Sequence, residues 1–246
     1  MDDQYVVGRN AVLEAIQANR EINKLWISEG SQKGSMQKII QAAKSRRIII
    51  QYVPRKKLDE ITKNHQGVIA QVAPYRYFEV DELLERAEKK NEPPFLLILD
   101  EIEDPHNFGS IMRTADASGV HGIIIPKRRS VGLTSTVAKA STGAIEHVPV
   151  ARVTNLARTI DDLKERGVWI CGTDAKGDLD YREIDGTLPI AIVIGSEGRG
   201  IGRLIKEKCD FLVRLPMKGH VTSLNASVAG ALLMYEIYRK RHPAGS

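Results

Sequence analysis

Two apolar segments near the end of the chain constrain its fold most, because each stops at a polar loop that contains glycine. Residues 190–194 (IAIVI) lead into 195–202 (GSEGRGIG), and residues 211–215 (FLVRL) lead into 216–225 (PMKGHVTSLN). The small residues that follow, 226–231 (ASVAGA), predict a closely packed helix capped by Ser223 or Asn225. Ligands of open α/β sheets bind beyond the carboxyl ends of the strands, so these loops are candidates for a functional site. An ordinary βα unit with ordinary turns is the alternative.

The same alternation begins at residue 95 and predicts a doubly wound α/β domain. Apolar runs at 95–99, 122–125, 147–150 and 168–171 are typical of strands, and residues 110–118, 135–140 and 156–166 favour helices. The polar segment 100–109 is expected to be a loop. About five parallel strands with crossover helices make such a sheet. No glycine-rich dinucleotide fingerprint and no P-loop follows the first strand, which argues against a nicotinamide-dependent enzyme.

The first 75 residues predict a separate, smaller α/β domain. Strand-like runs at 25–27, 48–53 and 67–72 alternate with helical segments at 36–43 and 56–62. Residues 76–94 contain a charged helix and an Asn-Glu-Pro-Pro breaker. We therefore expect an N-terminal domain at 1–75, a linker at 76–94 and a larger domain at 95–246.

All the excess positive charge lies in the first domain. Residues 1–75 hold 12 Lys and Arg against 7 Asp and Glu, whereas residues 76–246 hold 24 of each. This asymmetry is expected of a domain that steers toward a polyanion, although a solvated basic face would look the same. The residues predicted to contact the phosphates of such a polyanion are Arg46, Arg47, Arg55, Lys56 and Lys57.

The remaining totals exclude several classes of protein. Cys171 and Cys209 lack CxxC spacing, which argues against a structural metal site and favours two buried, reduced thiols. No apolar run approaches the roughly 20 residues that span a bilayer, and the acidic N-terminus is unlike a signal peptide. A cytoplasmic protein is expected.

Three blocks of sequence carry a resemblance to a known family. They are residues 104–116 (DPHNFGSIMRTAD), 194–200 (IGSEGRG) and 215–229 (LPMKGHVTSLNASVA). Together they resemble the SpoU family of RNA 2'-O-ribose methyltransferases, within the SPOUT superfamily. Residues 7–14 (VGRNAVLE) resemble the start of that family's small N-terminal domain, which is similar to ribosomal protein L30e. Residues 121–126 and 153–158 are most similar to the bacterial 23S rRNA guanosine-2'-O-methyltransferase branch.

The resemblance implies a catalytic domain with a deep trefoil knot, S-adenosylmethionine bound at the knot, and a homodimer with active sites at the subunit interface. It implies that Gly195, Leu215 and Leu224 contact the cofactor, largely through backbone, and that Thr142, Met217 and Asn225 lie around it. The catalytic residues that it implies are Asn107, Arg113, Glu197, Ser223 and Asn225. No metal is needed for methyl transfer to a hydroxyl.

The chemistry asks for alignment of the hydroxyl, methyl and sulfur, and for help with loss of the hydroxyl proton. An arginine stays protonated in proteins, so we expect Arg113 to favour ionisation of the ribose hydroxyl and to clamp phosphate. Asn107 and Glu197 are expected to hold Arg113 and the loops in place. His106 is the neighbour whose side-chain type titrates near neutral pH, which makes it an alternative base.

The leading hypothesis is an enzyme that methylates a guanosine ribose of 23S rRNA. Another rRNA nucleoside, or tRNA, is the alternative within the same class. A non-catalytic rRNA-binding assembly factor is the alternative from another class. The presence of Asn107, Arg113, Glu197 and Asn225 argues against that factor, because a decayed site would be expected to lose some of them.

Overall fold

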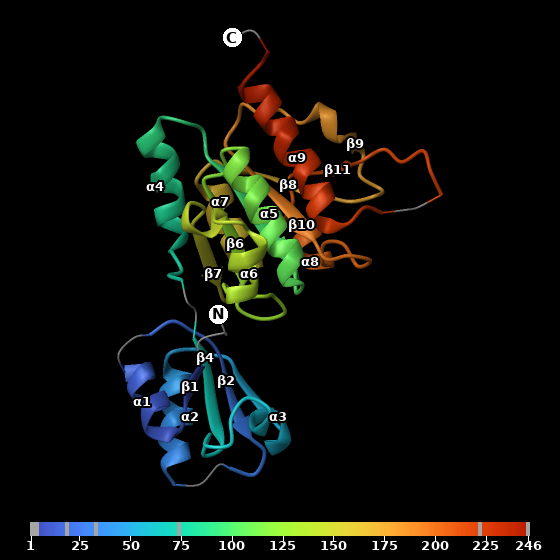
Figure 1. The fold of residues 1–246 in the computed structure, drawn as a ribbon. Coiled ribbons are helices and arrows are strands. Elements are labelled where there is room, and N and C mark those ends of the chain that lie inside the picture. The colour runs from blue at the N-terminus through green and yellow to red at the C-terminus, as the bar shows by residue number, and fades with distance from the viewer. Residues whose placement is uncertain (1–4, 18–19, 32–33, 73–74, 221–222, 245–246) are drawn as a thin grey trace. The chain divides into compact units, whose positions relative to one another are not determined.

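The computed structural model describes residues 5–17, 20–31, 34–72, 75–220 and 223–244. The chain forms two compact units (Figure 1). The first comprises Met1–Arg76 together with Gly132–Ser135, and the second comprises Tyr77–Val131 and Thr136–Ser246. This confirms the α/β fold class, and the chain divides into a small N-terminal unit and a larger one.

The first unit is built on a four-stranded sheet in the order β1-β4-β2-β3. Its elements are β1 (Tyr5–Val7), α1 (Arg9–Gln17), β2 (Ile22–Ser28), α2 (Ser35–Ser45), β3 (Ile50–Val53), α3 (Arg55–Asp59) and β4 (Val68–Val72). Strand β4 is antiparallel to β1 and β2, whereas β2 and β3 are parallel. Strand β1 had no counterpart among the sequence predictions.

Helices cover both faces of this sheet, because successive side chains of a strand point to opposite faces. Leu25 and Ile27 of β2 pack with Val12 of α1 and Met36 of α2. Trp26 points to the other face and packs with Val53, Ile69 and Leu58, which α3 supplies. Helices α1 and α2 therefore lie on one face and α3 lies on the other.

The second unit is built on a seven-stranded sheet in the order β7-β6-β5-β10-β8-β11-β9, in which every strand pair is parallel. The strands are β5 (Phe95–Asp100), β6 (Gly122–Pro126), β7 (Val150–Val153), β8 (Trp169–Thr173), β9 (Leu179–Asp180), β10 (Ile190–Gly195) and β11 (Phe211–Arg214). The central strands β5 and β10 are buried along their whole length, as their unbroken apolar sequences predict.

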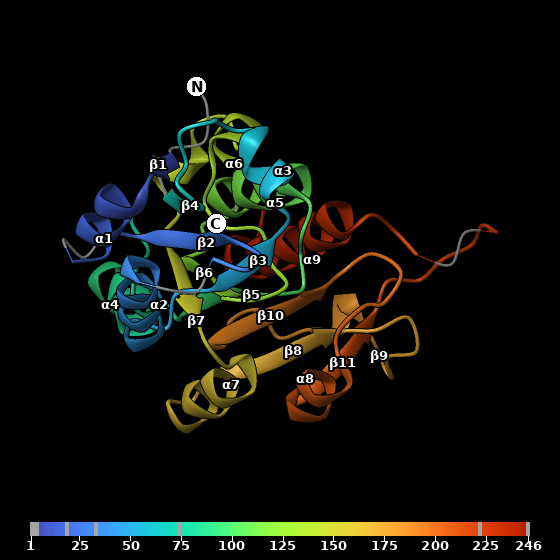
Figure 2. The same ribbon diagram turned by 90° about the horizontal axis from the view of Figure 1, so that it is seen from below.

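Helices cover both faces of the larger sheet (Figure 2). They are α4 (Val80–Lys90), α5 (Pro105–Ala117), α6 (Ser135–Ala140), α7 (Leu156–Glu165), α8 (Arg203–Lys208) and α9 (Ala226–Arg241), with short 3-10 turns at Ala144–Glu146 and Tyr181–Glu183. Leu96 and Ala191 pack with α4, α7 and α8 on one face. On the other face α9 lies against α5 and β10. The approach is close at Gly230 of α9, where an added Cβ would lie 2.7 Å from Ile194 of β10 and 3.9 Å from Ile111 of α5.

Four sequence expectations need correction. The expected linker at 76–94 contains α4, which belongs to the second unit because Leu83, Leu84 and Ala87 bury one stripe of the helix in its core. The expected loop at 100–109 ends early, because α5 begins at Pro105. The strand expected at 147–150 runs from Val150 to Val153, and seven parallel strands replace the expected five.

Both cysteines are free: Cys171 is buried as expected, but Cys209 is only partly buried. Burial raises the pKa of the Cys209 thiol to about 11 and that of Cys171 further, so both thiols stay protonated at neutral pH. None of the helices in the described ranges has the length and apolar character that a bilayer crossing requires. The described residues also contain no group of three or more His, Cys, Asp or Glu side chains that could hold a metal ion.

Candidate functional site

The candidate site lies at the carboxyl edge of the larger sheet, where β5 and β10 run side by side. Their register places Gly195, the last residue of β10, beside Asp100, the last residue of β5. The chain leaves β5 toward α5 and leaves β10 through a loop at 196–202. Two polar segments nearly a hundred residues apart in sequence therefore meet at one edge, as the strand pattern predicts.

Asp104 fixes the position of the first of these segments. Its carboxylate accepts hydrogen bonds from the backbone N–H of His106 at 3.2 Å and of Asn107 at 3.1 Å, and Pro105 occupies the first helical position. An acidic cap followed by proline is a preferred way to begin a helix. Asn107 consequently stands on the first turn of α5, where a regular backbone holds it, and not in a loop.

Asn107, Glu197 and Asn225 form a hydrogen-bonded cluster. Asn107 Nδ2 donates to Glu197 Oε1 at 3.0 Å, and Asn225 Nδ2 donates to Asn107 Oδ1 at 2.9 Å and also to Glu197 Oε1. These three residues come from α5, from the loop after β10 and from the residue before α9. Three of the five predicted catalytic residues are thus brought together, and the cluster ties three segments of the chain to each other.

Asn225 also caps α9, which settles the choice between the two predicted caps. Its Oδ1 accepts from the backbone N–H of Ser227 at 2.9 Å and of Val228 at 3.3 Å, and from the Ser227 hydroxyl. Ser223 is exposed and makes no hydrogen bond with any residue that the structure describes. The structure therefore gives Ser223 no place in the Asn107–Glu197–Asn225 cluster.

Arg113 lies apart from that cluster. It is exposed on α5, on the same stripe of the helix as His106 and Ser110, which precede it by seven and three residues. Within the described ranges its guanidinium makes no hydrogen bond or ion pair. The expectation that Asn107 and Glu197 hold Arg113 is wrong, because those two residues bond to each other and to Asn225. The positive charge of Arg113 is consequently available to an anionic ligand.

The loop after β10 closes tightly on itself, and Gly195 makes this possible. Ser196 and Gly200 form a bridge in which Gly200 N donates to Ser196 O at 2.8 Å. A Cβ at Gly195 would lie 2.1 Å from the carbonyl carbon of Gly200, which no side chain tolerates. Gly198 and Gly200 have φ values of 77° and 67°, in the left-handed region that favours glycine. The predicted cofactor residue Gly195 is thus required by the shape of the loop itself.

Asp100 anchors this loop to β5, and the sequence analysis missed it. Its Oδ2 accepts from Gly202 N at 2.7 Å. Burial raises the pKa of the Asp100 carboxyl, against the opposing effect of the Gly202 hydrogen bond. The available signal was a carboxylate placed directly after an apolar strand, where an unpaired charge would be costly.

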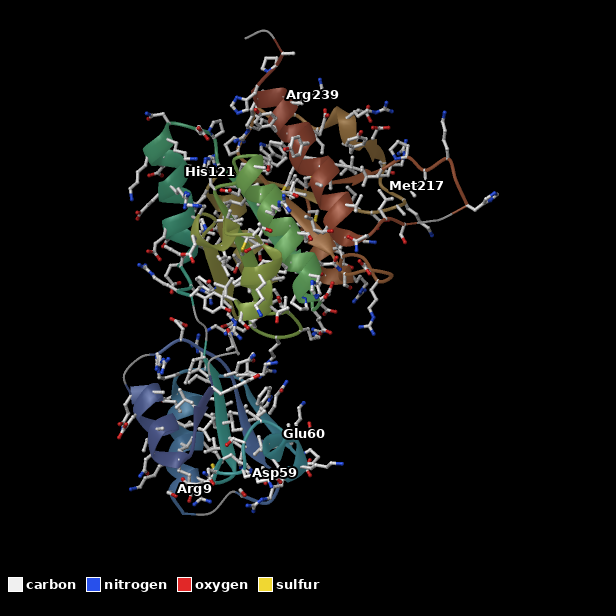
Figure 3. The ribbon with its side chains drawn as sticks, viewed as in Figure 1. Arg9, Asp59, Glu60, His121, Met217 and Arg239 are labelled. Atoms are coloured by element: carbon white, nitrogen blue, oxygen red, sulfur yellow. The ribbon has the colours of Figure 1, made fainter. Side chains whose placement is uncertain are left out.

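The other predicted cofactor residues lie on two segments near this edge. Leu215 and Leu224 are half-buried, and Met217 is exposed on the segment between β11 and α9 that projects from the unit (Figure 3). Residues 216–220 belong to no helix or strand, and their backbone groups bond to nothing in the described ranges. Thr142 follows α6 with φ of 52°, a strained value of the kind that clusters at functional sites.

The predicted RNA-binding residues fall into two groups within the first unit. Arg46 and Arg47 follow α2, whereas Arg55, Lys56 and Lys57 form the start of α3, on the opposite face of the sheet. The Arg46 guanidinium donates to the carbonyl of Ile16, so it ties α2 to α1. One continuous basic patch is therefore not formed by these five residues.

Comparison with known proteins gives matches along the whole chain. The SpoU rRNA Methylase family matches residues 94–235, and the family described as RNA 2'-O ribose methyltransferase substrate binding matches residues 5–78. The Bacillus subtilis (strain 168) protein YacO, named as a TrmH family tRNA/rRNA methyltransferase, is 66% identical over 242 residues, or 98% of this chain and 97% of YacO.

Two solved structures extend the comparison to the fold. The SpoU methyltransferase AviRb from Streptomyces viridochromogenes, in complex with the cofactor AdoMet, matches with a TM-score of 0.62 and 26% identity over 96% of this chain and 90% of AviRb. An AdoMet-bound rRNA methyltransferase from Sinorhizobium meliloti matches with a TM-score of 0.59 and 26% identity, over 96% of this chain and 86% of the other.

Proposed function

The chain belongs to the SpoU rRNA methylase family, and on that basis we propose that it transfers a methyl group from S-adenosylmethionine to the 2'-hydroxyl of a guanosine in 23S rRNA. The observation that carries the proposal is the Asn107–Glu197–Asn225 cluster at the carboxyl edge of the sheet, together with the Arg113 guanidinium further along α5, which pairs with no described residue. The choice of an rRNA guanosine rests on the resemblance of residues 121–126 and 153–158 to that branch. Such an enzyme would act in the cytoplasm.

The residues at this edge suit S-adenosylmethionine. The backbone N–H and C=O groups of residues 217–220 are free among the described residues to recognise the polar edge of an adenine, and Leu215 and Leu224 offer half-buried apolar surface. Gly195 ends β10 at this edge of the sheet, and the resemblance assigns Thr142 and Asn225 to places around the cofactor. When bound, the cofactor supplies a methyl group activated by a sulfonium.

The roles of the protein side chains follow from their surroundings. Arg113 has no carboxylate partner among the described residues, so its charge acts on the substrate, where it stabilises negative charge developing on the ribose oxygen and binds the neighbouring phosphate. Asn107, Glu197 and Asn225 position the helix and loops that surround the reaction. Ser223 is assigned to the turn that precedes Asn225. His106 shares the stripe of Arg113 and is the alternative acceptor for the hydroxyl proton.

We extend the proposal to a homodimer with a trefoil knot. Helix α9 exposes an apolar stripe made by Val228, Leu232, Tyr235 and Tyr238, which are between 39% and 50% exposed. Apolar residues repeated at helical spacing on a surface suit contact with a second subunit. Arg113 stands on α5, the helix that α9 packs against (Figure 1). The mass of a single chain in solution, measured by light scattering, would contradict this assembly.

Transfer of labelled methyl to unmodified 23S rRNA, 16S rRNA and tRNA, followed by mapping of the label, tests the proposal. Label confined to one guanosine ribose of 23S rRNA supports the proposal. Label in tRNA alone would mean that tRNA, and not rRNA, is the substrate. No label on any RNA would contradict the proposed activity. Arg113→Ala is expected to abolish transfer while leaving cofactor binding largely intact. Arg158→Ala is the matched control, because Arg158 is an exposed arginine on α7 whose guanidinium pairs with nothing in the described ranges.

A further inference from the structure

Two lysines lie near the ring of Trp26 on the α3 face of the first unit's sheet. Lys24 Nζ lies 5.6 Å and Lys57 Nζ lies 5.7 Å from the centroid of the Trp26 ring. The ring is held in place, because Trp26 Nε1 donates to Gln51 Oε1 at 2.9 Å and the residue is only 8% exposed. We refer to the surface formed by this ring, the two lysines and the neighbouring basic residues as the Trp26 surface; it comprises Lys24, Trp26, Arg55, Lys56 and Lys57.

The basic residues of α3 stand together at its start. Arg55, Lys56 and Lys57 are the first three residues of this five-residue helix, and the acidic Asp59 and Glu60 follow them (Figure 3). In the described ranges the side chains of Arg55 and Lys56 make no ion pair or hydrogen bond.

The nearby acids do not neutralise these cations. The Asp59 carboxylate faces His65 Nε2 at 3.0 Å, and Glu60 pairs with nothing that the structure describes. The stability of the unit therefore does not explain why three cations stand together at this point.

The phosphates of an RNA strand fit this arrangement. Lys57 is attracted to the aromatic face and makes no ion pair with a described residue. Its charge is therefore open to an anion that approaches the ring. A nucleic-acid backbone supplies such anions in series, so Arg55 and Lys56 would contact further phosphates.

The basic end of α2 offers no comparable arrangement. Arg46 is used to bond the carbonyl of Ile16, which leaves Lys44 and Arg47 as exposed single cations on the opposite face of the sheet. We propose that the Trp26 surface binds the sugar-phosphate backbone of the RNA substrate and that the end of α2 does not. This inference rests on the proposed function, because that function makes RNA the substrate.

Trp26 itself provides the readout. The chain contains two tryptophans, and Trp169, at the exposed start of β8, is outside the proposed machinery. In a full-length Trp169→Phe protein, indole fluorescence reports Trp26 alone. Titration with the RNA that accepts methyl is expected to change this fluorescence saturably as phosphates draw Lys24 and Lys57 from the ring. RNA binding measured by another method without a change in Trp26 emission would overturn the proposal.

Two triple variants with equal loss of charge provide the second measurement. Arg55→Gln/Lys56→Gln/Lys57→Gln alters the Trp26 surface, and Lys38→Gln/Lys44→Gln/Arg47→Gln alters exposed, unpaired cations of and beyond α2. Loss of three phosphate contacts is expected to reduce the slope of log affinity against log salt by about 2 to 3 and to weaken binding about tenfold or more near 0.15 M salt. The α2 variant is expected to change binding by less than about twofold.

Methyl transfer by the same proteins separates this inference from the proposed function. Equal losses of RNA affinity in the two variants would mean a general charge effect and would overturn the Trp26 surface, even if the wild-type chain methylates RNA. A larger loss in the α2 variant would overturn it as well. A wild-type chain that binds RNA through the Trp26 surface but methylates no RNA would instead overturn the proposed function alone.

Discussion

Replacement of Asn225 tests the construction of the site most sharply, because its two side-chain atoms do different work. Oδ1 caps α9 by accepting from the N–H groups of Ser227 and Val228. Nδ2 donates to Asn107 and Glu197. Asn225→Ala removes both functions, whereas Asn225→Ser retains an oxygen that can cap the helix and removes the amide donor. The difference between the two variants therefore isolates the cap, and Asn225→Ser isolates the cluster.

The expected magnitudes follow from these contacts. Loss of a helix cap costs about 1 kcal/mol, with a range of about 0.5–2. The two donated hydrogen bonds contribute about 0.5 kcal/mol each, at the low end of the usual range, because Asn225 is exposed. Asn225→Ala should thus lower the free energy of unfolding by about 2 kcal/mol and Asn225→Ser by about 1. In a domain of about 150–250 residues, 1 kcal/mol shifts Tm by about 2–4 °C, which gives losses of about 4–8 °C and 2–4 °C.

Calorimetry of the full chain, with methyl transfer measured on the same samples, checks this reasoning. Methyl transfer should fall in both variants, because Asn107 and Glu197 lose their link to α9, while only the alanine variant should show the larger loss of Tm. Equal Tm values for the two variants would refute the capping role. A serine variant with wild-type Tm and wild-type transfer would refute the role of the cluster.

Two pH-dependent predictions follow from buried titratable groups. Burial raises the pKa of the Asp100 carboxyl in the folded state, so its ionisation costs stability as the pH rises above the ordinary aspartate pKa of 3.8. Asp100→Asn keeps an acceptor for Gly202 and should therefore raise Tm at pH 7, but this advantage should disappear below about pH 4. A lower Tm of the variant at pH 7 would contradict the cost of ionisation. His121 is fully buried between Phe95 N at 3.0 Å and Glu92 Oε2 at 3.0 Å, and burial lowers its pKa from the ordinary 6.5. The unfolded chain then binds the proton more readily, so stability should fall as the pH drops below about 6.5. Chemical denaturation at several pH values should show that the free energy of unfolding of His121→Gln depends less on pH than that of the wild type. Parallel pH profiles would contradict the assignment to His121.

Apolar runs and the polar loops that follow them were enough to predict the central strands of the larger sheet. The runs at 95–99 and 190–194 form β5 and β10, and the polar loops behind them meet at the carboxyl edge as expected. The start of α5 was missed although its signal is present, because Asp104 and Pro105 are a cap and a first helical residue. Helix α4 was assigned to a linker because its charged residues outnumber the stripe of Leu83, Leu84 and Ala87 that buries it.

The arrangement within the site was beyond local patterns. Asn107 is separated from Glu197 by 90 residues and from Asn225 by 118, so no sequence periodicity connects the three. The resemblance identified them as a set but carried no information about which side chain bonds to which. A chain can place polar residues at the same sheet edge and still pair them in several ways. The pairing depends on how closely α5, α9 and the loop at 196–202 approach each other, and close contacts at Gly195 and Gly230 set that approach.

The observed pairing has a consequence for the chemistry. Had Glu197 bonded to Arg113, as expected, the carboxylate would have offset the charge that a substrate phosphate must meet. In the structure Glu197 accepts instead from the amides of Asn107 and Asn225, and Arg113 keeps its charge uncompensated by any described residue. A carboxylate satisfied by two neutral donors can connect three segments without neutralising the charge of Arg113. Different residues thus maintain the shape of the site and attract the anionic substrate. Substitution of Glu197 should therefore affect the shape of the site more than its attraction for the substrate.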